Sequence, residues 1–304
     1  MKEKERILNK IENDTTRPVL FSESRGGSES QLRLLFKFVP DEYFNNINLI
    51  LNNTDEKLID DKRINVLWIH HFIDQKEVQN LKNQTYLDKI DYFIFNSNWN
   101  FEHHHYKFKI PKNKSIVLKN AIEKIPFTEK PKDKINLVYH TTPWRGLNVL
   151  ISAYKKLNLK DVELNICSST IIYGRKFYLD YEKKFQQIFD ECKKLKNAKY
   201  HGFVEHSNLI KILQKMHIFS YPSIWPETSC IAAIEAMAAG CEIVTTNLGA
   251  LPETCSGFGK FVNFNKNLNL LEKNFLESLE QSINNFWSEE NQKKLDKQKK
   301  EINK

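Results

Sequence analysis

The sequence contains no long apolar run. No stretch of about 18 uninterrupted apolar residues occurs in its 304 positions, so it predicts no transmembrane helix. The N-terminal segment MKEKERILNKIENDTT is charged and lacks the apolar centre of a secretory signal peptide. We therefore expect a cytoplasmic protein, and we leave open a peripheral contact with a membrane.

Cysteines are few and widely spaced. The five, at positions 167, 192, 230, 241 and 255, form no Cys-x-x-Cys pair, the spacing of many zinc and redox sites. Cys230 and Cys241 stand in apolar stretches, where a free thiol acts as a small hydrophobic side chain. This pattern favours a reducing compartment and argues against a disulfide framework.

The charge excess is moderate. Lys and Arg number 46 against 38 Asp and Glu, which gives a formal charge of +8 and favours anionic partners such as phosphates. No run of five or more basic residues occurs, so we expect no nucleic-acid groove. With 40% hydrophobic and 12% aromatic residues, the chain can build sizeable cores, which excludes a disordered protein.

Short apolar runs recur at the length of buried strands and alternate with segments of helical spacing. The runs are PVLF (18–21), INLIL (47–51), VLWI (66–69), YFIF (92–95), SIVL (115–118), INLVYH (135–140), VELNIC (162–167), AKYHGF (198–203), HIFSY (217–221) and EIVTT (242–246). The helical segments are 28–38, 99–108, 146–157, 178–195, 206–215 and 229–239. This alternation predicts parallel α/β sheets.

A charged segment with two prolines, KIPFTEKPKDK (124–134), separates two such α/β series. We therefore expect two α/β domains, 1–128 and 129–266, facing each other across a cleft, and a helical tail at 267–304. Ligands of such folds bind outside the carboxyl ends of the strands.

Two glutamates flank the start of a predicted helix of small residues. Glu227 lies in the loop after strand 217–221, and Glu235 lies inside the helix, for which Thr228 or Ser229 would be the N-cap and Gly240 the stop. The helix N-terminus favours an anion, and the two carboxylates can accept hydrogen bonds from hydroxyls. A nucleotide sugar has this polarity. An isolated pair at this spacing more often has a structural role.

The pair lies in a longer pattern: Pro222 and Ser223, then Glu227, seven residues, Glu235-Ala-Met-Ala-Ala-Gly240, a strand, and Gly249 to Glu253. With this pattern, residues 18–265 resemble the retaining glycosyltransferases of family 4, the glycogen-synthase-like group, whose GT-B fold has two Rossmann-like domains. TTPWRGLNVLISAY resembles the phosphate-binding turn, with Arg145 in place of a lysine. RGGSES, NSNWN and VLKNAIEKIPF resemble further segments of the family.

The resemblance implies roles for these residues. Glu227 would bind hydroxyls of the transferred sugar, Glu235 the ribose, and the backbone of Thr228, Ser229 and Cys230 the phosphate and sugar. Arg145 would bind the diphosphate. His140 would stand where the family often carries a second basic residue, and Gly26 and Gly27 would let backbone approach the donor.

Histidines in the first half are harder to interpret. His70 and His71 end a predicted strand at the position of a family histidine near the donor sugar. Successive strand residues point to opposite faces, so only one can face the cleft, and we prefer His70. A histidine pair without a functional role is nearly as plausible. Three consecutive histidines, 103–105, point about 100° apart on a helix and cannot converge on a metal ion. We interpret them as an exposed helix face.

The sequence thus predicts a metal-independent glycosyltransferase of the hexosyl-transferring kind, without a cofactor, with Glu227, Arg145 and His70 as catalytic residues. It would move a sugar from a nucleotide-diphosphate sugar to a hydroxyl of a glycan, glycolipid or other glycoconjugate, with retained configuration. No Asp-x-Asp motif offers a metal site. The alternatives are a nucleotide-sugar-binding GT-B protein without transfer activity and a GT-B sugar-nucleotide epimerase.

Overall fold

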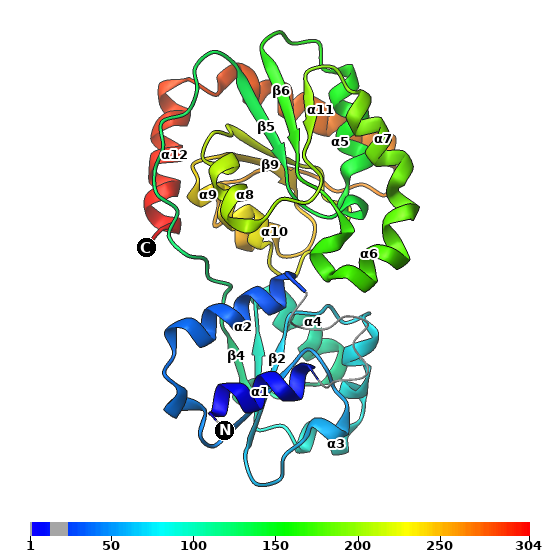
Figure 1. The fold of residues 1–304 in the computed structure, drawn as a ribbon, viewed down its shortest axis with the longest axis vertical. Coiled ribbons are helices and arrows are strands. Elements are labelled where there is room, and N and C mark those ends of the chain that lie inside the picture. Colours follow the sequence, from blue (N-terminus) through cyan, green and yellow to red (C-terminus); the bar gives the residue numbers. More distant parts are fainter. Residues whose placement is uncertain (1, 13–23) are drawn as a thin grey trace. The chain divides into compact units, whose positions relative to one another are not determined.

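The computed structural model describes residues 2–12 and 24–304, and the chain divides into two compact units (Figure 1). Unit 1 is Met1–Ala121 and unit 2 is Ile122–Lys304. The predicted strand at 18–21 falls outside the described residues. Within the described residues, no helix has both the length and the apolar character needed to cross a bilayer.

Unit 1 contains a four-stranded parallel sheet in the order β1-β2-β3-β4. Its strands are β1 (Ile47–Leu51), β2 (Ile64–Ile69), β3 (Tyr92–Phe95) and β4 (Ser115–Val117). Its helices are α1 (Glu3–Glu12), α2 (Gly27–Phe38), α3 (Gln84–Asp88) and α4 (Asn98–Phe108). Alternate residues of β2 enter two different core clusters, so the sheet is buried on both faces, which is why its strands read as continuous apolar runs.

Unit 2 contains a six-stranded parallel sheet in the order β10-β9-β8-β5-β6-β7. Its strands are β5 (Ile135–Tyr139), β6 (Val162–Ile166), β7 (Ala198–Tyr200), β8 (Ile218–Tyr221), β9 (Glu242–Thr246) and β10 (Lys260–Val262). From β5 the chain builds the sheet in one direction to β7, and then from β8 in the other direction to β10. The point of reversal between β5 and β8 is where doubly wound sheets bind their ligands.

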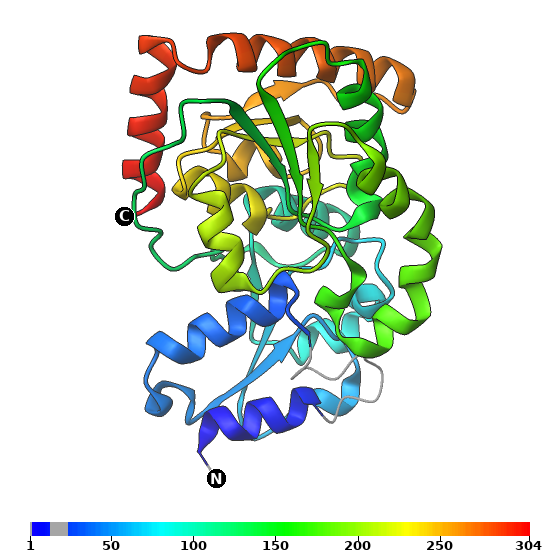
Figure 2. The same cartoon turned by 45° about the horizontal axis from the view of Figure 1, so that its top comes forward.

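The helices of unit 2 cover its sheet (Figures 1 and 2). They are α5 (Leu147–Lys156), α6 (Arg175–Tyr181), α7 (Gln186–Lys194), α8 (His206–Leu213), α9 (Ile231–Ala238), α10 (Leu251–Thr254), α11 (Leu268–Asn285) and α12 (Glu289–Ile302). Figure 2 shows α11 and α12 running in different directions; α11 packs on α5 and β9, and α12 packs on α9. The predicted tail 267–304 therefore lies within unit 2 in the structure.

The predicted α/β architecture with parallel sheets is confirmed. Nine of the ten predicted strands fall within the described residues, and each corresponds to one of β1 to β9. The predicted helix at 178–195 is interrupted, since the chain forms α6, a short 3-10 turn and α7. Strand β10 was not predicted, because it is a half-buried edge strand that starts at a lysine and has no apolar run of four residues.

Candidate functional site

Two loops leave the sheet of unit 2 at the reversal point, one after β5 and one after β8. The first loop carries Arg145 and the second carries Glu227. The Arg145 Nη1 donates to both carboxylate oxygens of Glu227, at 2.8 and 3.1 Å. The hydroxyl of Tyr221, the last residue of β8, donates to Glu227 Oε1 at 2.5 Å. The fold thus joins two of the predicted site residues, which are 82 positions apart, in one ion pair.

Gly146 allows the two loops to meet. Its φ is +122°, and a Cβ built there would lie 2.1 Å from the carbonyl oxygen of Pro222. The Ile224 N–H also donates to the Arg145 carbonyl at 3.3 Å. A side chain at position 146 would push the loops apart, so the glycine after Arg145 sets the distance between the guanidinium and the loop of Glu227.

The backbone of Glu227 is fixed from its other side by Gly249. Glu227 forms an isolated parallel bridge with Gly249, and its carbonyl accepts from the Ala250 N–H at 2.7 Å. A Cβ at Gly249, whose φ is +69°, would lie 2.5 Å from the Glu227 carbonyl oxygen. The Gly249 turn therefore holds Glu227 in extended backbone before the helix begins.

This extended backbone corrects the predicted start of the helix. Neither Thr228 nor Ser229 is the N-cap, because α9 begins at Ile231 and Cys230 occupies the cap position without a side-chain cap bond. The predicted end is confirmed: Gly240 has φ +78°, and the Gly240 and Cys241 N–H groups donate to the carbonyls of Met237 and Ala236, a Schellman motif.

The Arg145 guanidinium keeps part of its hydrogen-bonding capacity. Nε is buried and has no hydrogen-bond partner among the described residues, and Nη2 has only a 3.4 Å contact with the Tyr173 hydroxyl. The Trp225 ring lies 5.8 Å from the guanidinium carbon. Burial lowers the pKa of Arg145, but Glu227 and the nearby tyrosines outweigh it and raise that pKa well above its ordinary value. The edge formed by Nε and Nη2 is thus a permanent cation that can bind an anionic oxygen pair.

His140 follows β5 at the same edge of the sheet. Its ring is buried, lies 4.8 Å from the Phe219 ring, and has no hydrogen-bond partner for Nε2 in the described structure. Burial lowers the pKa of His140 to about 4, so the ring is neutral near pH 7. The residue in the predicted second basic position therefore carries no positive charge, which leaves Arg145 as the cation.

Glu235 projects from the second turn of α9, and its carboxylate Oε1 lies 2.6 Å from Nε2 of His206, the first residue of α8. The Glu235 side chain is 10% exposed and that of His206 is 68% exposed. No spacing rule links positions 206 and 235, and sequence reasoning missed this contact because the fold alone creates it.

The remaining predicted site residues lie in unit 1. Gly26 is the N-cap of α2, with φ −61°, and Gly27 is its first residue. His70 follows β2; its ring lies 4.7 Å from the Trp68 ring, and its N–H donates to Asn52 Oδ1 at 2.6 Å. Burial, with a smaller effect of His71, lowers the pKa of His70 to about 3, so its imidazole is neutral at physiological pH.

We had expected the three histidines at 103–105 to form an exposed helix face, and this prediction is wrong. His104 is buried against Phe95 and Phe108, and burial lowers its pKa to about 4. The three Nδ1 atoms contact the separate carbonyls of Trp99, Asn100 and Ile110. Across residues 2–12 and 24–304, no group of three or more His, Cys, Asp or Glu side chains could hold a metal ion.

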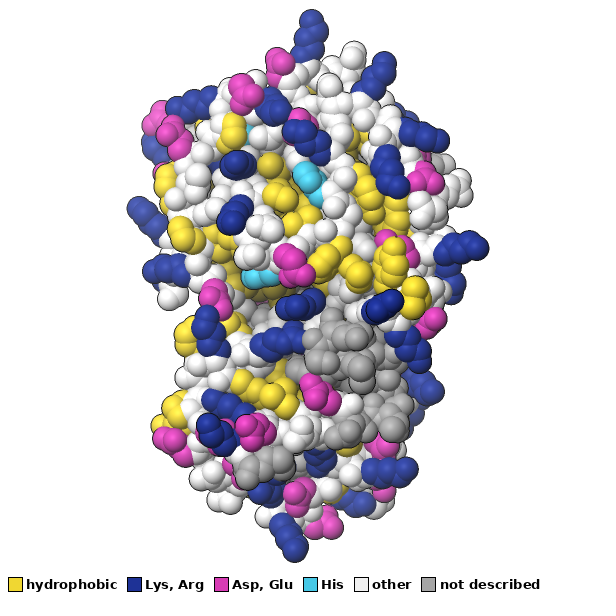
Figure 3. Space-filling model, in the orientation of Figure 1, with side chains coloured by type: hydrophobic (Ala, Val, Ile, Leu, Met, Phe, Trp, Pro, Cys, Tyr) yellow, Lys and Arg dark blue, Asp and Glu magenta, His cyan; other side chains and the backbone are white. Residues whose placement is uncertain are grey.

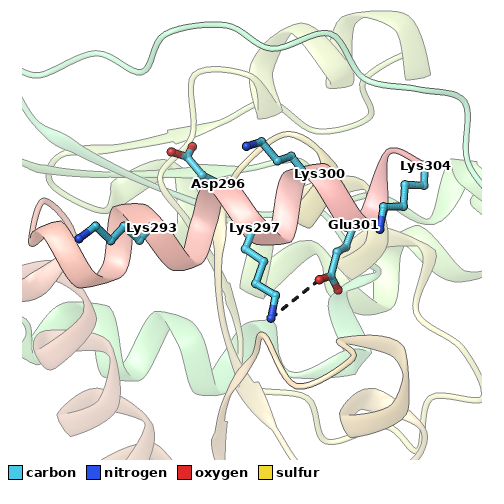
Figure 4. A pocket seen from close by; sticks show the side chains of 6 residues that line it. All are labelled: Lys293, Asp296, Lys297, Lys300, Glu301 and Lys304. Carbon is cyan, nitrogen blue, oxygen red and sulfur yellow. Dashed lines mark ion pairs between the residues drawn. The ribbon is translucent and has the colours of Figure 1, made fainter.

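A shallow groove on α12 includes none of the predicted site residues in its lining (Figure 4). It is lined by Lys293, Asp296, Lys297, Lys300, Glu301 and Lys304. Lys297 pairs with Glu301 at 3.9 Å, so part of the positive charge is compensated. Figure 3 shows Lys and Arg side chains spread over the visible face, with no concentration over one element. The structure thus gives no reason to assign the groove a ligand.

Comparisons with known proteins show the family and the fold of the chain. Residues 119–302 match the profile of the family described as Glycosyl transferases group 1. A curated relative, an uncharacterized 41.2 kDa protein in the cps region of Klebsiella pneumoniae, is 24% identical over 265 residues, which is 77% of this chain and 65% of the relative. The chain thus spans slightly less than two thirds of that protein's length.

Two solved structures share the fold. The pneumococcal O-GlcNAc transferase GtfA, in complex with UDP and GlcNAc, has a TM-score of 0.61 at 13% identity, covering 90% of this chain and 58% of GtfA. HepE of Anabaena, in complex with UDP-glucose, has a TM-score of 0.57 at 15% identity, covering 84% of this chain and 77% of HepE. At these identities the likeness concerns the fold, which is that of GT-B glycosyltransferases.

Proposed function

The chain belongs to the Glycosyl transferases group 1 family, and from that premise we propose that it transfers a sugar from a nucleotide-diphosphate sugar to an acceptor hydroxyl, with retained configuration. The observation that carries the proposal is the Arg145–Glu227 pair at the reversal point of the sheet. The pair supplies a cationic edge and a carboxylate side by side, which suits a ligand with a diphosphate next to a hydroxyl-rich ring.

In this proposal Arg145 binds the diphosphate while it stays paired with Glu227. Nη1 contacts the carboxylate, and Nε together with Nη2 forms the second face of the guanidinium fork. That face can bind two phosphoryl oxygens and stabilise the charge that develops on the leaving diphosphate. The backbone of residues 228–230, at the start of α9, would add N–H groups and the positive end of the helix.

Glu227 would accept hydrogen bonds from hydroxyls of the transferred sugar, and Glu235 from the ribose. The bond from the sugar's anomeric carbon to the diphosphate breaks, the acceptor oxygen bonds that carbon on the same face, and the acceptor proton passes to the leaving phosphate. No protein nucleophile is required. The imidazole of His70, in unit 1, is neutral, so it would donate or accept a hydrogen bond without adding charge.

UDP is the first nucleotide to test, because the two solved structures described above hold UDP or UDP-glucose. We propose a glycan or lipid-linked glycan as acceptor, which is consistent with the cps-region location of the Klebsiella relative. No metal or cofactor is needed in this scheme, since Arg145 supplies the positive charge at the leaving group.

Calorimetry with UDP, GDP and ADP, followed by transfer assays with the matching sugar nucleotides, tests the proposal. We expect one diphosphate to bind and Arg145→Met to weaken it at least tenfold, since a charge-assisted bidentate contact is lost. Arg63→Met is the matched control, because Arg63 is paired with Glu3 at 2.8 Å and is 24% exposed, close to the 23% of Arg145. Binding that is equal in both variants would contradict the proposal, and binding without transfer to any acceptor would indicate a binding protein.

A further inference from the structure

The contact between α8 and α9 joins an exposed histidine to a shielded glutamate. His206 Nε2 lies 2.6 Å from Glu235 Oε1, a short distance typical of a charge-assisted hydrogen bond. Glu235 lies inside its helix with a side chain only 10% exposed. The histidine therefore reaches inward from the surface to a carboxylate that has little access to solvent.

Only one oxygen of this carboxylate is engaged. Among the described residues, no side chain or backbone group donates to Glu235 Oε2. A carboxylate has about four lone-pair positions, so Oε2 retains the capacity to accept two hydroxyl donors. A vicinal diol such as that of ribose presents two such donors. His206 fixes the direction in which this free oxygen points.

We propose that His206 is a positioning residue that holds Glu235 for the ribose hydroxyls of the donor nucleotide and makes nucleotide affinity fall as pH rises. The inference rests on the proposed function, in which Glu235 binds ribose. It adds a residue of α8 that would touch the carboxylate and act through it.

The charges around the pair set the direction of the pH effect. The hydrogen bond that His206 donates to Glu235 raises the pKa of His206 above its ordinary 6.5, partial burial opposes this, and the charges of Glu235 and Glu123 add to the rise. His140 also lies in the field of Glu235, but burial lowers its pKa to about 4, so it stays neutral in this range. Glu205, next to His206 in the chain, is a further negative charge. Above the raised pKa, His206 loses its proton and holds Glu235 less firmly.

The test is calorimetric titration with UDP and with 2′,3′-dideoxy-UDP at about pH 6 and about pH 8.5, on either side of the histidine titration. The two ligands carry the same phosphates, so the ratio of their affinities cancels the titration of the ligand itself. The proteins are the full-length chain and its variants His206→Gln, His206→Lys, Glu235→Gln and His206→Gln/Glu235→Gln. Thermal unfolding would check that each variant is folded. The His206 side chain is 68% exposed and is not part of a core, so its replacement should not prevent folding.

We expect His206→Gln to weaken UDP about tenfold at the lower pH, the size of one charge-assisted hydrogen bond, and to leave dideoxy-UDP unchanged. His206→Lys should keep most of the UDP affinity and remove its pH dependence, because lysine stays charged. In the Glu235→Gln background, the added His206→Gln should have no further effect.

Each other outcome has a defined meaning. Unchanged or tighter UDP binding by His206→Gln, or an equal loss with dideoxy-UDP, would overturn the inference and leave the proposed function standing. Tighter binding would mean that His206 competes with ribose for Glu235. If the unmodified chain bound none of UDP, GDP and ADP, the proposed function would fail, and the inference with it.

Discussion

Removing one partner of the Arg145–Glu227 pair should destabilise unit 2 through the charge that is left behind. The Glu227 side chain is 6% exposed, and Arg145 is the cation that faces it at 2.8 Å. Arg145→Met leaves a carboxylate without its cation in a site with little water. Breaking a buried pair from one side costs about 3–5 kcal/mol.

The reverse change should cost less, because Arg145 is 23% exposed and can recover part of its hydration. Glu227→Gln keeps the shape of the side chain and an oxygen that accepts from Tyr221. We expect a loss of about 2–3 kcal/mol for this variant, toward the lower end for a partly solvated charge. The double variant Arg145→Met/Glu227→Gln removes both charges, so it should be more stable than the sum of the single losses by at least about 1.5 kcal/mol.

Urea unfolding of the four proteins measures this coupling, and thermal unfolding gives a second reading. In a unit of this size, about 4 kcal/mol corresponds to roughly 8–16 °C in Tm. The Arg63–Glu3 pair of unit 1 is the control: it has the same 2.8 Å separation but both side chains are more exposed than Glu227, so its coupling should be much smaller. If the two single losses at Arg145 and Glu227 added within about 0.5 kcal/mol, the pair would not be a coupled buried unit and the reasoning would be refuted.

Three further changes test other parts of unit 2. Gly146→Ala should lower the free energy of unfolding in urea by at least about 3 kcal/mol and abolish UDP binding. The new Cβ would clash with the Pro222 carbonyl, and the φ of +122° disfavours alanine. An unchanged unfolding midpoint would contradict the argument that Gly146 sets the loop spacing. Lys130→Met should cost about 2–4 kcal/mol, since its Nζ donates to the carbonyls of Met216 and Ala239, which would lose this charged donor. A loss no larger than that of an exposed Lys132→Met control would contradict this. The His206–Glu235 pair should stabilise unit 2 fully below pH 6.5 and lose this contribution as pH rises through the raised pKa of folded His206. The difference in Tm between the unmodified chain and His206→Gln should therefore shrink over that pH range. A constant difference would contradict this stabilising role of the pair.

The strands were predictable because parallel sheets covered on both faces consist of continuous apolar residues. INLIL, YFIF and EIVTT coincide with β1, β3 and β9. The same rule fails for β10, which is half-buried at the sheet edge. The burial of His104 was not predictable either. Three consecutive histidines suggest an exposed segment, but the helix places the middle side chain against Phe95 and Phe108.

The contacts of the candidate site residues were not predictable from the sequence. The motif singled out Arg145 and Glu227 separately, but it contained no sign that the two would form an ion pair. That pair depends on Gly146 meeting Pro222, a contact across two crossover connections. The His206–Glu235 contact likewise depends on how α8 packs on α9. Such contacts arise from tertiary packing, which local patterns do not encode.

The two glutamates, eight positions apart, are supported by different elements. Glu227 lies in a bridge with Gly249, and Glu235 lies in α9, which starts at Ile231. One carboxylate is held by the loops of the sheet edge and the other by α8. If the two carboxylates bind hydroxyls as proposed, their independent supports suit a donor whose sugar and ribose lie on opposite sides of a diphosphate.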